Sequence, residues 1–321
     1  MTNLVIMENE HKADSGEQPL QALILSLNER LQANPQNGAA LFERAQIYSS
    51  LKNYPEALRD VSAAISVQRK WVEAWVLRAE TFAFLKDYEA AFVNYEVALK
   101  LDLRRAATYW SRARLYEYLA LTTVQGRSNP AYREKNGRAA LADYGMAFRL
   151  EPQSRNYIRA RARLGKELGE YIQAIADYNH WLELEPTSLL AIADRADICA
   201  RLGQNEQAIT DYSYLIEHKP IGSLYQKRGF VYKAQGEYRL ALLDLASALQ
   251  LNPATHQQRL TLHQTRADIF RQIGRNDKTI EELKQIVPLE EALFGSSALT
   301  REKIRKLEPH SDTGSLYSSV Q

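Results

Sequence analysis

The feature that most constrains this chain is a motif of about 34 residues that recurs along most of its 321 residues. Self-comparison aligns seven copies, of which the third has about fifteen extra residues and the fifth is one residue short. Such a period predicts stacked structural units that contact only their neighbours along the chain. The copies are 38–71, 72–105, 106–154, 155–188, 189–221, 222–255 and 260–293.

Small and large residues recur at fixed positions within each copy. Position eight is small, and it is Ala45, Ala79, Ala113, Ala162, Ala196, Gly229 and Ala267. Position twenty is alanine in six copies and Thr279 in the seventh, while position twenty-four is a bulky residue such as Tyr95, Tyr144 or Leu245. Small residues let two helices approach closely, and large ones at helical offsets fill the space beside them.

The helix-breaking residues indicate two helices in each copy. Glycines at a shared position, such as Gly169 and Gly236, fall where a first helix ends, a place that favours a left-handed residue. Prolines such as Pro186 and Pro220 follow the second helix, which they cannot continue. Each copy is therefore predicted to be a helix-turn-helix hairpin that buries its apolar face against the next.

This pattern resembles the tetratricopeptide repeat family, in a variant with Arg-Ala in the first helix, and the resemblance covers about residues 38–293. It implies an all-α fold, a right-handed α-α superhelix. The copies depart from the family where a small residue is replaced by Trp181, Leu215 or Ile286. Pentatricopeptide repeats lack this small-residue signature, and armadillo or HEAT units are longer.

A charged pair is predicted inside the repeat unit. Position seven is arginine in every copy, and position twenty-three is acidic in six copies and Asn94 in the second. Because the two positions meet across an antiparallel hairpin, we expect an arginine–carboxylate contact that satisfies a partly buried guanidinium. The pairs include Arg44–Asp60, Arg112–Asp143, Arg161–Asp177, Arg195–Asp211 and Arg228–Asp244, with Arg78–Asn94 and Arg266–Glu282 completing the set.

The segments outside the regular copies have distinct roles. We expect a solenoid over 17–308, with capping helices at 19–34 and 297–307, and disordered polar tails at 1–16 and 309–321. The insertion at about 120–136 contains Asn129 and Pro130, a suitable cap and first-turn pair for a helix through Phe148. The insertion is either a contact for one partner or a tolerated surface extension.

Composition argues against several classes of protein. The formal charge is +2, so no global field attracts nucleic acid, and no apolar run is long enough to span a membrane. The single cysteine, Cys199, excludes an intrachain disulfide and occupies a core position. No metal-ligand, phosphate-loop or catalytic pattern is recognisable, so we predict a non-enzymatic, cytoplasmic protein that needs no cofactor.

The resemblance implies that a ligand lies in a concave groove lined by first-helix positions two, five, nine and twelve. Phe42 and Trp110 are large apolar residues at groove positions where we expect that the repeat does not need them for its own packing. Arg114, Arg159, Arg163 and Lys166 are cations at groove positions, and the segment 155–166 has five basic residues and no acid. We predict a scaffold or adaptor that binds a peptide or helix of another protein, with RNA binding through 155–166 as the alternative and self-association left open. The family's carboxylate clamp does not carry over, since Phe42, Gln46 and Leu77 occupy its positions. The candidate partner-binding residues are Phe42, Trp110, Arg114, Arg159, Arg163 and Lys166.

Overall fold

In a computed structural model, the described residues, 17–251, 253 and 255–308, form helices joined by short turns, with no strand among them. The all-α prediction is confirmed. The tails predicted at 1–16 and 309–321 lie outside the described residues. The helices are α1 (Glu17–Ala33), α2 (Gly38–Ser50), α3 (Tyr54–Val67), α4 (Val72–Phe84), α5 (Tyr88–Leu101), α6 (Ala106–Leu121), α7 (Val124–Ser128), α8 (Pro130–Leu150), α9 (Arg155–Leu168), α10 (Tyr171–Leu184), α11 (Leu189–Arg201), α12 (Asn205–His218), α13 (Gly222–Gln235), α14 (Tyr238–Gln250), α15 (His256–Gln272), α16 (Asn276–Phe294) and α17 (Ala298–Leu307).

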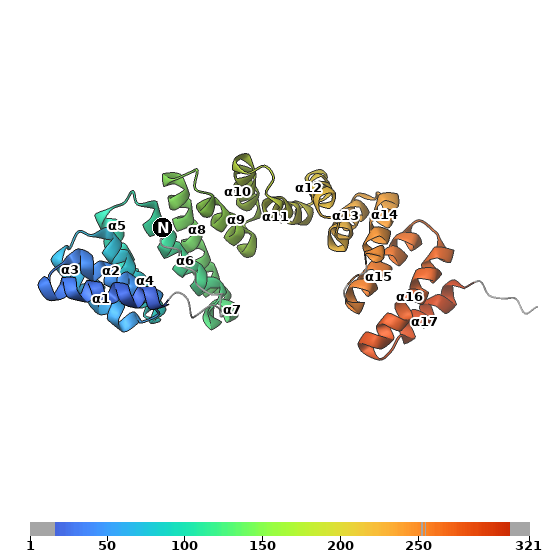
Figure 1. The fold of residues 1–321 in the computed structure, drawn as a ribbon. Coiled ribbons are helices and arrows are strands. Elements are labelled where there is room, and N and C mark those ends of the chain that lie inside the picture. Colours follow the sequence, from blue (N-terminus) through green and yellow to red (C-terminus); the bar gives the residue numbers. More distant parts are fainter. Residues whose placement is uncertain (1–16, 252, 254, 309–321) are drawn as a thin grey trace, which may run out of the picture. The chain divides into compact units, whose positions relative to one another are not determined.

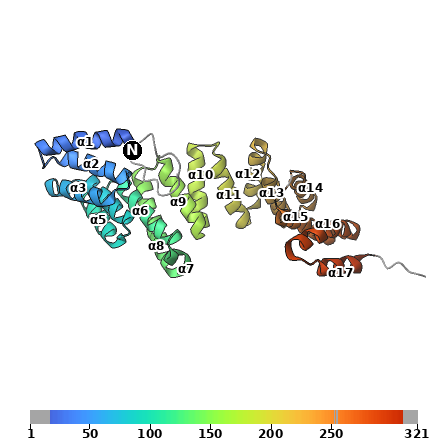
Figure 2. The same cartoon turned by 60° about the horizontal axis from the view of Figure 1, so that its bottom comes forward.

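The chain divides into two compact units, one ending at Asp177 and the other beginning at Tyr178. In the first unit, α2–α3, α4–α5 and α6–α8 form successive packed pairs, and α1 packs on α2 (Figure 1). In the second unit, α11–α12, α13–α14 and α15–α16 form pairs, and α17 packs on α16 (Figure 2). Each pair matches the first and second helix of one predicted copy.

The small positions lie in the interior of the pairs. The alanines at positions eight and twenty, such as Ala45, Ala91 and Ala208, are fully buried. Bulky position-twenty-four side chains, including Tyr95 and Tyr144, are also buried beside them. Close helix approach and side-chain filling therefore occur at the places that the period predicts.

The turn inside six of the seven hairpins uses a left-handed residue, and the exception is the third hairpin, which carries the insertion. Gly169 ends α9 with φ 83°, and Gly236 ends α13 with φ 82°. In the first two copies the same repeat position is Lys52 and Lys86, with φ 60° and 63°. The turn geometry is thus kept even where a lysine must adopt a conformation that glycine adopts more easily.

The insertion lengthens the third pair and adds a short helix. Asn129 caps α8 by accepting a hydrogen bond from the Tyr132 backbone, and Pro130 is its first residue, as predicted. The sequence did not predict α7, which Thr123 caps by accepting from the Gly126 backbone. Figure 1 shows α7 at the end of the α6–α8 pair, where it contacts both helices.

Candidate partner-binding face

The predicted arginine pairs are contacts between the two helices of each copy. Arg44 donates from Nε and Nη2 to the two carboxylate oxygens of Asp60 at 2.6 and 2.8 Å. Arg161 binds Asp177 in the same bidentate way, and both carboxylates are 2% exposed. The same bidentate contact joins Arg112–Asp143, Arg195–Asp211 and Arg228–Asp244. Arg266 contacts a single oxygen of Glu282 through Nε and Nη2, and Arg78 donates to Asn94.

The pKa values of these arginines depend on the charge of the partner. The hydrogen bond to Asp60 raises the pKa of Arg44, and the bond to Asp244 raises the pKa of Arg228. Burial lowers the pKa of Arg78, whose partner Asn94 is neutral. A carboxylate therefore offsets the loss of hydration that a buried guanidinium suffers, whereas an amide does not.

Phe42, on α2, is half-buried rather than free in a groove. Its ring lies 4.5 Å from the ring of Trp71, and it packs against the core residues of the first two helix pairs. The expectation that the repeat does not need this side chain for its own packing is wrong, because the loop before α4 places Trp71 beside it. Its role in partner binding stays a prediction.

Trp110, on α6, is likewise half-buried and packs between two copies. Its ring centre lies 5.2 Å from Tyr144 of α8 and 5.1 Å from Tyr157 of α9. The same expectation is therefore wrong for Trp110, which fills the junction of the third and fourth copies. A contact with a partner through its remaining exposed edge stays a prediction.

Arg163, on α9, has a partner that lies far away in the sequence. Its Nη2 donates to Glu117 of α6 at 2.5 Å, and the other Glu117 oxygen accepts from the Tyr144 hydroxyl at 2.6 Å. The Arg163 side chain remains 56% exposed, while Glu117 is nearly buried. The segment 155–166 has no acid of its own, but Glu117 holds Arg163 in place at the surface.

The other predicted cations lie near this contact. Arg159 is exposed and Lys166 half-buried, and both belong to α9, as Arg163 does. Neither is without an interaction partner. Arg114, on α6, is half-buried, and its charge acts on Glu80 of α4 and on Tyr144.

Acidic residues complete the first-helix face, which we define as the side formed by positions two, five, nine and twelve. Burial raises the pKa of Glu80, which accepts from Ser111 of α6 at 2.8 Å. Contacts at Glu80 and Glu117 therefore link α4, α6 and α9 along this face. Both acids occupy groove positions, nine and twelve, but the sequence interpretation did not count them among the partner-binding residues.

The first helix of the fifth copy, in the second unit, carries acids instead. The hydroxyl of Tyr212 donates to Asp197 at 2.7 Å, and that of Tyr178 donates to Asp194 at 3.0 Å. Lys227 of α13 also donates to Asp197. These carboxylates were not among the predicted site residues, though Asp197 stands at position nine.

Other kinds of site receive little support in the described part of the chain. No group of three or more His, Cys, Asp or Glu side chains there could hold a metal ion. Cys199 is buried, and burial raises the pKa of its thiol, which disfavours the reactive thiolate. None of the described helices combines the length and apolarity needed to cross a bilayer.

The comparisons with known proteins agree with this architecture. The tetratricopeptide repeat family matches residues 72–104, the α4–α5 pair. Two solved structures share the fold: Naa15/Naa10 bound to HypK-THB (TM-score 0.64, 17% identity, 84% of this chain and 38% of that one) and the C-terminal part of a tetratricopeptide repeat-containing protein from Cytophaga hutchinsonii (TM-score 0.58, 16% identity, 74% and 93%). At these identities they show the fold alone.

A curated relative supports the same family. The Hsp70-Hsp90 organizing protein of Triticum aestivum is 29% identical over 75 residues, which are 23% of this chain and 13% of that protein. This chain thus spans only a small part of the relative's length. Residues 72–104 match a tetratricopeptide repeat, and the chain shares the fold of tetratricopeptide repeat proteins. That fold supports a role as a protein–protein interaction scaffold.

Proposed function

We propose that this protein is a non-enzymatic scaffold whose first-helix face binds a peptide or helical segment of a partner protein, with α9 receiving an acidic stretch. Arg163 carries the proposal, because Glu117 orients it while more than half of its side chain stays exposed. The structure uses one of its guanidinium nitrogens, so other N–H groups can donate to a carboxylate of a ligand.

The surroundings of Arg163 suit an acidic ligand with apolar side chains. Arg159 and Lys166 add positive charge to the same helix, and Trp110 offers a partly exposed ring on the adjacent α6. Glu117 and Glu80 lie deeper in this face, where they hold Arg163 and Ser111. We place this activity in the cytoplasm, in keeping with one free cysteine.

Binding of labelled dodecapeptides to the full chain tests the proposal. We expect a Glu/Leu peptide to bind and a Gln/Leu peptide to bind about tenfold more weakly, since each charge-assisted hydrogen bond contributes on the order of 1.4 kcal/mol or more. Reversing three charges, in Arg159→Glu, Arg163→Glu and Lys166→Glu together, abolishes this preference. The matched control is Arg138→Glu, at an exposed arginine on α8 that pairs with Glu134.

RNA binding is the competing outcome of the same experiment. The probe for RNA binding is a dodecamer of uridine. If it binds more tightly than the Glu/Leu peptide, and its affinity falls steeply as salt rises, the face recognises phosphate groups and not an acidic peptide. Equal binding of the Glu and Gln peptides refutes the acidic specificity. Homo-oligomerisation is checked by sedimentation before either titration.

A further inference from the structure

Three position-seven arginines make an additional bond to the preceding second helix. Their Nη1 atoms donate to a polar side chain of that helix, the one that stands at position twenty-five in the numbering of the repeat. Arg44 donates to Asn28 at 2.7 Å, Arg195 to Asn179 at 2.8 Å and Arg228 to Ser213 at 2.9 Å. The carboxylate pair and this polar residue together satisfy both ends of the guanidinium.

The fourth copy lacks this additional partner. Position twenty-five of the preceding copy is Gly145, on α8. A Cβ added to Gly145 would have only the Arg161 Nη1 atom within 4 Å, at 3.7 Å. Arg161 uses Nε and Nη2 for Asp177, and its Nη1 has no acceptor among the described residues. A largely buried guanidinium thus keeps a donor directed to the space that an Asn or Ser side chain fills elsewhere.

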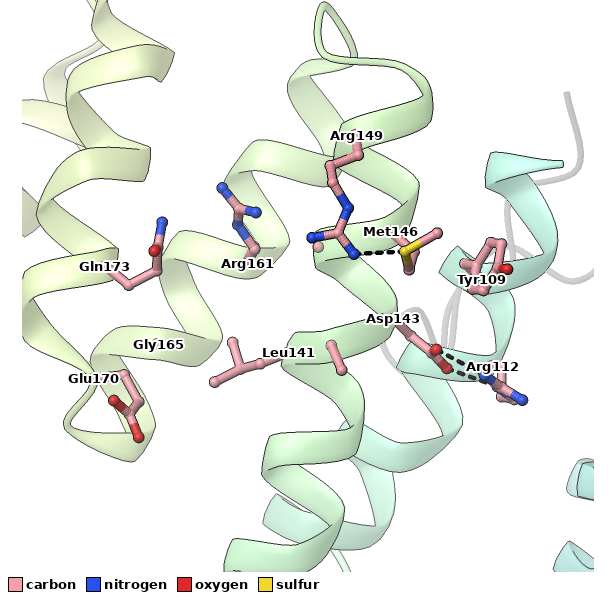
Figure 3. A pocket seen from close by; sticks show the side chains of 12 residues that line it. Tyr109, Arg112, Leu141, Asp143, Met146, Arg149, Arg161, Gly165, Glu170 and Gln173 are labelled. Carbon is pink, nitrogen blue, oxygen red and sulfur yellow. Dashed lines mark hydrogen bonds and ion pairs between the residues drawn. The ribbon is translucent and has the colours of Figure 1, made fainter. Parts of the chain in front are cut away.

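That space is part of a cavity of about 530 Å³ between α6, α8, α9 and the start of α10. Arg161 and Arg149 both line it, together with apolar surface from Tyr109, Leu141 and Met146, as Figure 3 shows. Arg149 contacts the Met146 sulfur, which is a weak acceptor, and forms no ion pair within the described residues. The volume is in the range of sites for small ligands.

The charges around the cavity leave Arg149 unmatched. Arg112 is paired with Asp143, and Arg161 with Asp177, which also accepts from Gln173. Glu170, the remaining lining carboxylate, lies apart from Arg149 in Figure 3. The cavity therefore offers guanidinium donors on one side without an anionic acceptor there.

From this geometry we infer a second binding site, in which a carboxylate or similar oxyanion is held between Arg149 and Arg161 in the place of the missing position-twenty-five side chain. None of the predicted residues of the first-helix face lines this cavity. The carboxylate belongs either to a small organic acid or to an acidic side chain of a partner protein, and the two sources are separable by experiment.

Calorimetric titration of the full chain with citrate, inorganic phosphate and the Glu/Leu dodecapeptide, at constant ionic strength, tests the site. Gly145→Asn restores the residue type found beside Arg44 and Arg195 and improves helix propensity. We expect this variant to melt at a higher temperature than the wild type and to bind the anion about tenfold more weakly or not at all. Arg149→Gln weakens binding similarly, while Arg138→Gln, on the same helix but outside the cavity, leaves it unchanged.

The pattern of outcomes decides both the site and its ligand. If the wild type binds citrate or phosphate and Gly145→Asn abolishes that binding, the ligand of the site is a small anion. If the wild type binds the Glu/Leu peptide but not citrate, and Gly145→Asn weakens peptide binding, the ligand is an acidic side chain of a partner protein. Wild-type protein that binds none of the probes, or Gly145→Asn that binds as the wild type does, overturns the inference. Gly145 and Arg149 line this cavity and lie outside the first-helix face, so their variants test this site independently of the proposed function.

Discussion

The first helices of the fourth and fifth copies, α9 and α11, have the same interior and opposite outer charge. Arg161 and Arg195 each make a bidentate contact with a buried aspartate of the following second helix. At position nine, however, α9 carries Arg163, whereas α11 carries Asp197. Each of these residues has a partner on a neighbouring first helix of its own unit, Glu117 for Arg163 and Lys227 for Asp197.

The comparison teaches which part of the repeat is free to vary. The interior positions must satisfy a guanidinium and let two helices approach, so any change there leaves a buried charge or a clash. The outer positions remain in contact with water, which tolerates either sign of charge. Partner recognition is therefore expected from the outer positions, and stability from the interior ones.

The largest predicted effect is the loss of an interior carboxylate. Asp177→Ala and Asp211→Ala each leave a largely buried arginine without its carboxylate partner. Each variant is expected to lose about 3–5 kcal/mol of unfolding free energy. Urea denaturation followed by circular dichroism measures both. Glu281→Ala, which removes an exposed partner of Lys278, is the control and is expected to cost about 0–1 kcal/mol. If the two aspartate variants lose markedly different amounts of unfolding free energy, the claim that α9 and α11 have the same interior is wrong.

A smaller effect concerns pH, because one glutamate in each unit has a shifted pKa and the two shifts are in opposite directions. For Glu282, burial favours the neutral form, but hydrogen bonds from His263 and Arg266 outweigh it and lower the pKa. The stability that Glu282 contributes is present above its unfolded pKa and is lost as pH falls through the depressed folded pKa. We expect Glu282→Gln to unfold more easily than the wild type at pH 7, with the difference shrinking in acid.

The smallest effect has the opposite sign, at Glu80 of the first unit. Burial raises the pKa of this carboxyl, so folding is disfavoured as pH rises from the unfolded pKa through the raised folded pKa. Glu80→Gln keeps an acceptor for Ser111 and is expected to be modestly more stable than the wild type at neutral pH. Thermal melts across pH compare the two glutamine variants, and slopes of the same sign contradict the assignment.

Most of the fold was predictable because the same packing contacts recur in every copy of the repeat. Alanine at position eight and arginine at position seven recur with constant spacing, so one hairpin explains all seven copies. Two local features escaped prediction. Helix α7 depends on a single cap at Thr123, and α16 continues past Pro288 to Phe294, where packing outweighs the usual effect of proline.

The candidate site was less predictable because it depends on contacts between copies. Trp110 stands at an outer position, yet Tyr144 and Tyr157 surround it, and neither is its neighbour in sequence. Glu117 reaches Arg163 across 46 residues. Aligning position twelve of one copy with position nine of the next would have suggested this pair, whereas an analysis within one copy could not.

The central claim is that the interior arginine–carboxylate pairs hold the repeat together, while the exposed arginine of the first-helix face, Arg163, binds the acidic peptide. Its most direct test compares Arg195→Gln, where the arginine side chain is 18% exposed, with Arg163→Gln, where it is 56% exposed, by measuring unfolding free energy and Glu/Leu peptide affinity for both. We predict that Arg195→Gln loses about 3 kcal/mol of stability and keeps its affinity. Arg163→Gln should lose less than about 1 kcal/mol of stability and about tenfold in affinity. Equal losses of stability, or an unchanged affinity in Arg163→Gln, contradict the account.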